Sequence, residues 1–165
     1  MPQEFNHQQA IRLAVQTEKE LMTFYRRAAA MAVDPGGKKV FERLAKDEEE
    51  HVSHFFRHYR GTEFGTLEEF VNAPCQTDAP MLKELDKLIN DEVKERKAME
   101  IALKHEDQLE SNLRNTARQI VDPGVRVIFD QMAKETRNHY QIIESEYARL
   151  MGMVHESDID TYVRE

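Results

Sequence analysis

Acidic and imidazole side chains occupy five positions of this chain where helical periodicity places the apolar face of a helix. They are Glu18, Glu48, His51, Glu106 and His139. An ionised carboxylate in a helical core is very costly unless it is neutralised, paired or bound to metal. No Lys or Arg falls on the same apolar stripes. Since carboxylates and imidazoles suit iron or manganese, with zinc as a substitute, the five residues predict a buried metal site.

The same kinds of side chain recur 88 positions apart, because residues 10–55 align without a gap to residues 98–143. The alignment contains 14 identities in 46 pairs and includes a Val-Asp-Pro-Gly turn in both halves. In this alignment Glu18 matches Glu106, and His51 matches His139. A duplicated helix pair that keeps its buried acids and imidazoles predicts that both halves contribute ligands to one centre.

Glu48 and His51 lie three residues apart, so on a helix they project from one face and can chelate one ion. Two ions a few ångströms apart need bridging carboxylates, which a glutamate from each half could supply. The expected cofactor is therefore iron, with two ions as the main expectation and one ion as the alternative.

Long periodic segments separated by few glycines and prolines predict an all-α protein. The expected helices cover about residues 6–32, 34–61, 80–90, 91–121 and 122–151, with shorter ones at 67–71 and 157–163. Tight turns make each repeat an antiparallel hairpin, and one long crossover joins the two, as in a ferritin-like four-helix bundle. A single domain over residues 1–165 is expected, with repeat one at about 8–60, the crossover at 61–90, repeat two at 91–151 and a terminal segment at 152–165.

The bulk composition excludes several classes of protein. A net charge of -8 and a pI near 5.4 disfavour binding to nucleic acid or anionic membranes. One cysteine, Cys75, rules out an internal disulfide framework and an iron centre held by four thiolates. The N-terminus has no basic region followed by an apolar run, and no segment approaches the roughly 20 apolar residues that span a bilayer. A soluble cytoplasmic protein is expected.

The chain resembles the rubrerythrin and ferritin-like di-iron carboxylate superfamily. Residues 18–25 resemble the first-helix pattern of that family, a ligand glutamate seven residues before a tyrosine. Residues 44–51 resemble its second-helix motif, with alanine, glutamate and histidine at matching spacing. In the second half Glu106, Ala133 and His139 fall where the pattern expects them.

The resemblance spans about residues 8–147 apart from the 61–90 segment, and it implies peroxide reduction or ferrous iron oxidation at a di-iron site. The expected partners are a small oxidant, peroxide or dioxygen, and a second copy of the chain in a homo-oligomer, with a dimer favoured over a storage cage. Because the chain carries no rubredoxin domain, a separate electron donor such as a rubredoxin-like protein is expected.

The resemblance also assigns the ligands. Glu18, Glu48 and His51 would bind one iron, and Glu106 and His139 would bind the other, with Glu48 as the bridge. Tyr25 lies near the first ligand, where it could carry an electron, donate a hydrogen bond or only pack.

One ligand of the family pattern is missing, because Thr136 stands where the fourth helix should carry a glutamate. Glu135 could replace it if the helix rotates or bulges, since one residue swings a side chain by about 100° around the axis. Glu110, solvent, an exogenous anion or the Thr136 hydroxyl are the other candidates. If none completes the site, the rival function is a non-catalytic metal-binding or iron-handling scaffold. Asp47, beside Glu48, is predicted to face water.

Overall fold

The computed structural model describes residues 5–75 and 79–152, and within these ranges it contains only helices and turns. The helices are α1 (His7–Met31), α2 (Pro35–Phe56), α3 (Leu67–Asn72), α4 (Pro80–Asp86), α5 (Lys94–Gln119) and α6 (Pro123–Leu150). The prediction of an all-α chain is confirmed, and the arrangement is consistent with a ferritin-like helical bundle. The short helix predicted at 157–163 lies outside the described residues.

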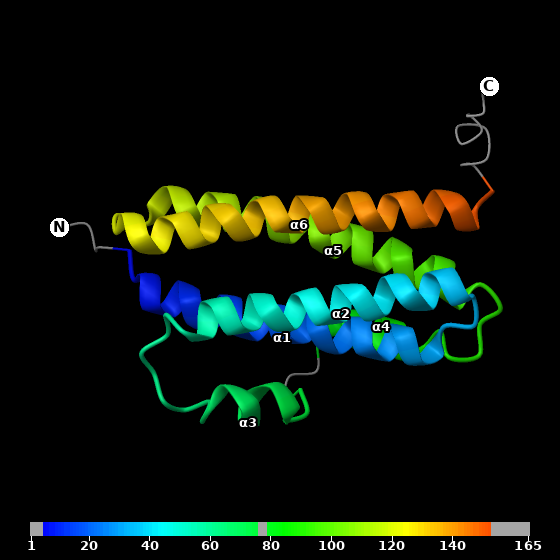
Figure 1. Ribbon diagram of the computed structural model, residues 1–165, viewed down its shortest axis with the longest axis horizontal. Helices are drawn as coiled ribbons and strands as arrows, with labels where there is room; N and C mark the ends of the chain where they lie inside the picture. Colours follow the sequence, from blue (N-terminus) through cyan, green and yellow to red (C-terminus); the bar gives the residue numbers. More distant parts are fainter. Residues whose placement is uncertain (1–4, 76–78, 153–165) are drawn as a thin grey trace, which may run out of the picture.

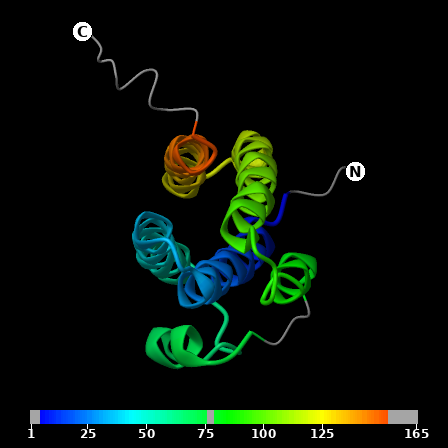
Figure 2. The ribbon, with the colours of Figure 1, turned by 90° about the vertical axis from the view of Figure 1, so that its right-hand side faces the viewer.

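Four long helices form two antiparallel hairpins, α1 with α2 and α5 with α6 (Figure 1). Across the hairpins α2 packs against α6 and α1 against α5, and the end-on view shows the four axes around a common centre (Figure 2). Helices α2 and α5 run in the same direction, so the connection between them returns along the bundle (Figure 1). This is the long crossover expected from the sequence.

The turns inside both hairpins are fixed by the same local chemistry. Asp34 caps α2 by accepting a hydrogen bond from the Gly37 N–H at 2.8 Å, and Asp122 caps α6 through the Gly124 N–H at 2.8 Å. In both cases a proline follows at the first helical position, where its missing N–H leaves no unsatisfied donor. The repeated Asp-Pro-Gly sequence therefore starts the second helix of each pair.

The crossover segment packs on the outside of the first hairpin. Helix α3 begins with a capping box between Thr66 and Glu69, and Phe70 on it packs against Phe56 of α2 at a ring distance of 5.8 Å. Lys19 of α1 is buried with its ammonium 4.4 Å from the Phe70 ring centre. Helix α1 is therefore covered on two faces, one toward the bundle interior and one toward α3.

Most predicted helix boundaries agree with the structure within a few residues. The predicted break near residues 90–91 is confirmed, since α4 ends at Asp86 and α5 begins at Lys94. Helix α2 ends at Phe56, earlier than expected. Beyond it the N–H groups of His58 and Tyr59 bond carbonyls three residues back rather than four, so the chain leaves the α-helical pattern. No helix in the described part of the chain has both the length and the apolar composition that crossing a membrane requires.

Candidate metal centre

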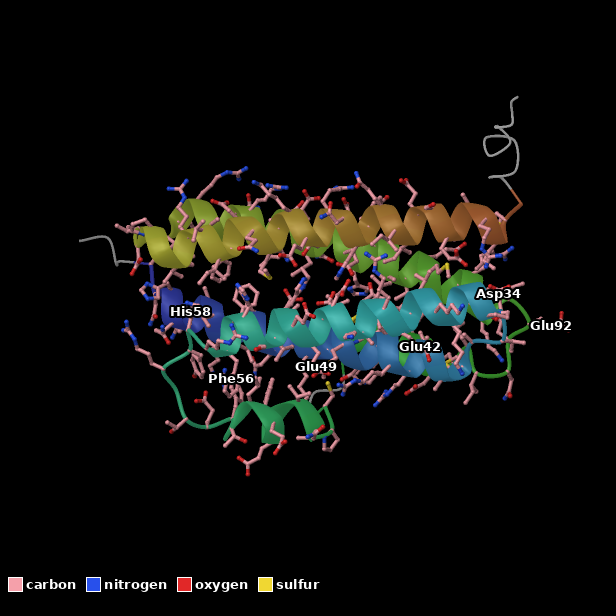
Figure 3. All side chains as sticks on the ribbon, viewed as in Figure 1. Asp34, Glu42, Glu49, Phe56, His58 and Glu92 are labelled. Atoms are coloured by element: carbon pink, nitrogen blue, oxygen red, sulfur yellow. The ribbon has the colours of Figure 1, made fainter. Side chains whose placement is uncertain are left out.

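The five side chains predicted as ligands converge in the interior between the two hairpins. Glu18 of α1, Glu48 of α2 and Glu106 of α5 are 0% exposed, while His51 of α2 and His139 of α6 are 3% exposed. Figure 3 shows side-chain oxygen and nitrogen atoms gathered between the hairpins near the middle of the bundle. The apolar stripes of four helices thus bring acids and imidazoles from both repeats to one place.

Glu48 lies at the centre of this group, between the two histidines. Its Oε1 lies 3.1 Å from His51 Nδ1, and its Oε2 lies 3.1 Å from His139 Nδ1. The two imidazole rings are nearly parallel, with centres 5.1 Å apart and planes 14° apart. One ligand atom from each of the three residues falls within 4.8 Å of the others, a spacing that can hold a metal ion.

Glu18 and Glu106 flank the centre in matching positions. Glu18 Oε1 lies 3.5 Å from His51 Nδ1, and Glu106 Oε2 lies 3.5 Å from His139 Nδ1. Both Glu18 oxygens and Glu106 Oε1 are buried without a hydrogen-bond partner. A buried polar atom left unsatisfied costs about 1–3 kcal/mol. Three buried carboxylate oxygens without a donor, on the two glutamates beside these imidazoles, fit a site that binds cations.

Tyr25 lies in the first repeat but bonds a glutamate of the second repeat. It is 0% exposed, and its hydroxyl donates to Glu106 Oε2 at 2.5 Å. The residue that aligns with it in the second repeat is Leu113, which has no hydroxyl to offer Glu18. The two halves of the site therefore differ, since Glu106 has a fixed donor and Glu18 has none.

Two further carboxylates lie at the outer side of the histidine rings. Glu135 Oε1 lies 2.9 Å from His51 Nε2, and Asp47 Oδ2 lies 3.3 Å from His139 Nε2. Each contacts the ring nitrogen opposite the one that faces Glu48. Glu135, predicted as a replacement ligand, thus lies outside the inner group, and Asp47, predicted to face water, is half-buried. The repeat contains a signal for this pair, because Asp47 and Glu135 align.

The position of the missing glutamate is filled by a buried hydroxyl. Thr136 is 1% exposed and donates to the Met132 carbonyl at 2.7 Å, one turn back on α6. Glu110, the other candidate replacement, pairs instead with Arg114 at 2.9 Å and Arg137 at 2.6 Å. Neither Glu135 nor Glu110 takes the place of the missing carboxylate.

The charges in the metal-free site are strongly coupled. Burial raises the pKa of Glu18 well above its usual value, and the charge of Glu48 adds to this; burial and Glu48 also raise the pKa of Glu106. Burial opposes ionisation of Glu48, but His51 and hydrogen bonds within the group lower its pKa overall. Burial opposes the charged form of both imidazoles. Hydrogen bonds with Glu106 and Glu48 nevertheless raise the pKa of His139 to about 10. The charge of Glu48 likewise raises the pKa of His51. Binding a cation here must displace protons.

The protein treated with a chelator should become less stable as the pH rises toward 10. The pKa of His139 is about 10 in the folded chain and about 6.5 in an unfolded one, so its stabilising contribution is complete below about pH 6.5 and is lost as the pH rises through about 10. Urea unfolding at these two pH values measures the change. His139→Gln should make this loss of stability smaller but not abolish it, because the pKa of His51 is also raised. A wild-type midpoint that stayed constant or rose would contradict the assignment.

Comparison with known proteins points to one family. The Rubrerythrin family model matches residues 3–59, which hold α1, α2 and with them Glu18, Tyr25, Glu48 and His51. The candidate ligands on α5 and α6, Glu106 and His139, lie beyond the matched range and are related to the first set by the internal repeat. Searches of curated proteins and of solved structures found no match. The matched helix pair, the all-helical bundle and the candidate metal group are consistent with a rubrerythrin-like member of the ferritin-like superfamily.

Proposed function

We propose that this chain binds two iron ions and reduces hydrogen peroxide, or oxidises ferrous iron, at the site between its hairpins. Glu18 and His51 would hold one ion, Glu106 and His139 the other, and Glu48 would bridge them. The observation that carries the proposal is the convergence of three buried glutamates on the Nδ1 atoms of two histidines, with three carboxylate oxygens left without donors. Oxygen and imidazole donors suit ferrous iron, and no thiolate is within this group.

The iron ions, when bound, would supply the two electrons needed to reduce peroxide to water. The chain provides what such a reaction needs around them. Tyr25 keeps a proton on its hydroxyl, because burial and Glu106 raise its pKa well above 10. The hydroxyl oxygen lies 2.5 Å from Glu106 Oε2, so the proton between them can be held or returned there. The buried aromatic rings of Phe24 and Phe41 pack against Tyr25 and keep bulk water away from it.

A non-catalytic metal-binding scaffold is the second candidate, and Thr136 favours it. The Thr136 hydroxyl is committed to a backbone carbonyl, so the site offers three carboxylates rather than four. Two divalent ions would then carry one positive charge more than the glutamates neutralise. Such a site could hold one ion well and the second poorly, and an ion that binds alone cannot share a two-electron reaction.

Anaerobic loading with ferrous iron, followed by one equivalent of peroxide, separates these two functions. If the chain is an enzyme, it should bind close to two irons. The bound iron should be oxidised much faster than free iron in the same buffer, as measured by near-ultraviolet absorption. A variant lacking both imidazoles, His51→Gln with His139→Gln, should lose both properties, whereas Glu144→Gln on the exposed face of α6 should keep them. If the chain binds one iron or fewer, and this iron is oxidised no faster than free iron in buffer, the protein is a metal-binding scaffold and not an enzyme.

A further inference from the structure

We propose that Asp47 and Glu135 are positioning residues, each holding one site histidine so that its Nδ1 faces the metal. The inference rests on the proposed metal site and adds to it two residues outside the inner group. Neither residue would touch the ions or the oxidant. Each would act through the imidazole ring that it contacts.

The first pair joins the two hairpins. His51 on α2 places Nδ1 at 3.1 Å from Glu48 and Nε2 at 2.9 Å from Glu135 on α6. The two nitrogens of an imidazole point away from each other, so a carboxylate on Nε2 cannot reach an ion bound at Nδ1 of the same ring. A carboxylate acceptor requires a proton on Nε2, and this leaves the Nδ1 lone pair for the metal.

The second pair repeats this geometry with the helices exchanged. His139 on α6 places Nδ1 at 3.1 Å from Glu48 and Nε2 at 3.3 Å from Asp47 on α2. The two pairs are related by the internal repeat, since Asp47 aligns with Glu135. An accidental surface contact has no reason to appear twice in equivalent positions of two hairpins.

Both carboxylates are anchored at the boundary between the interior and solvent. The Asp47 and Glu135 side chains are 33% and 38% exposed, while the imidazoles that they contact are almost fully buried. Glu135 also accepts a hydrogen bond from Gln131 at 3.2 Å, one turn back on α6. Asp47 lies 3.9 Å from Arg43, one turn back on α2. Glu135 is thus held by a hydrogen bond from its own helix, whereas Asp47 has only a longer ionic contact there, and each acid contacts a histidine on the opposite hairpin.

The two halves should not depend equally on these partners. Glu135 contacts its histidine at 2.9 Å, a normal hydrogen-bond length, whereas Asp47 lies at 3.3 Å with its shorter side chain. Removing the Glu135 carboxylate should therefore weaken the ion beside His51 more than removing the Asp47 carboxylate weakens the ion beside His139. Loss of such an outer partner typically lowers metal affinity about 10–100-fold.

Cobalt substitution tests the inference without any turnover. In the full-length protein loaded with Co²⁺, the Nε2 protons of the two ligand histidines should give two paramagnetically shifted NMR signals that exchange with solvent. Glu135→Ala should speed the exchange of one signal and lower the affinity of one ion, and Asp47→Ala should affect the other signal and the other ion. Glu135→Gln and Asp47→Asn, which keep an acceptor oxygen, should restore slow exchange and most of the affinity.

Matched controls use acids on the same helices that face solvent. Glu50→Gln on α2 and Glu144→Gln on α6 remove the same charge at exposed positions and should change neither signal nor affinity. If the alanine variants bind cobalt like the wild type with both signals unchanged, the positioning role is wrong although the metal site stands. The proposal would also be overturned if the two alanine variants and the two control variants had equal effects. Equal effects would indicate that the overall negative charge of the protein, and not contact with a histidine, sets the metal affinity. A wild type that binds no Co²⁺ would remove the metal site and this inference together.

Discussion

Glu48→Gln should abolish tight binding of both metal ions while the helical fold persists. Glu48 is the residue that contacts Nδ1 of both histidines at hydrogen-bonding distance, so one substitution acts on both halves of the site. An outer partner of a ligand typically contributes about 10–100-fold to affinity. Loss of the central carboxylate should therefore cost more than about 100-fold for each ion. Metal content after dialysis and a Co²⁺ titration measure the loss, and circular dichroism checks the fold.

The flanking glutamates give this experiment its internal comparison. Glu18→Gln should weaken mainly the ion beside His51, because Glu18 lies 3.5 Å from that histidine. Glu106→Gln should weaken the ion beside His139 and also deprive Tyr25 of its charged acceptor. Glu50→Gln, two residues beyond Glu48 and exposed, should bind like the wild type. Two ions bound with unchanged affinity in Glu48→Gln would exclude a bridging role for this residue.

The fold could be predicted because its determinants are local and repeated. Helix starts depend on caps such as Asn6, Asp34 and Asp122, whose side chains bond backbone N–H groups within three residues. The inner residues could be predicted for a related reason. A helix that places apolar residues on one face carries any polar residue on that face into the interior, and Glu18 and Glu106 follow this rule.

Features that depend on contacts between distant segments escaped prediction. Lys19 lies off the apolar stripe of α1, yet the crossover segment covers it, because Phe70 and the Pro74 carbonyl pack over its ammonium. Asp47 and Glu135 lie one residue off their stripes, which places them at the rim. Whether such a side chain turns outward to water or inward to a histidine depends on the opposite hairpin, and the sequence of one helix does not contain that information.

Thr136→Glu should change the stability of the protein in opposite directions without and with metal. Thr136 is 1% exposed and aligns with Glu48, so the new carboxylate would enter a site that already buries three glutamates. Without metal the two imidazoles already contact Glu48, Glu135 and Asp47, so a fourth buried acid is left uncompensated. The free energy of unfolding should fall by about 3 kcal/mol, near the cost of an uncompensated buried charge. With two divalent ions, four carboxylates balance the four positive charges, whereas three carboxylates do not.

Metal should therefore stabilise the variant more than it stabilises the wild type. If the fourth carboxylate tightens the second ion about tenfold, a metal concentration near 100 times the dissociation constant of the variant is only about 10 times that of the wild type. The second ion would then stabilise the variant by about 2.7 kcal/mol and the wild type by about 1.4 kcal/mol. Thermal unfolding with chelator and with excess Zn²⁺ or Fe²⁺ measures both effects. Thr136→Gln is the matched control, because it adds similar volume without charge: it should destabilise the metal-free protein and gain no more from metal than the wild type does. A Thr136→Glu variant whose second ion binds no tighter would show that this position of α6 does not face the ions.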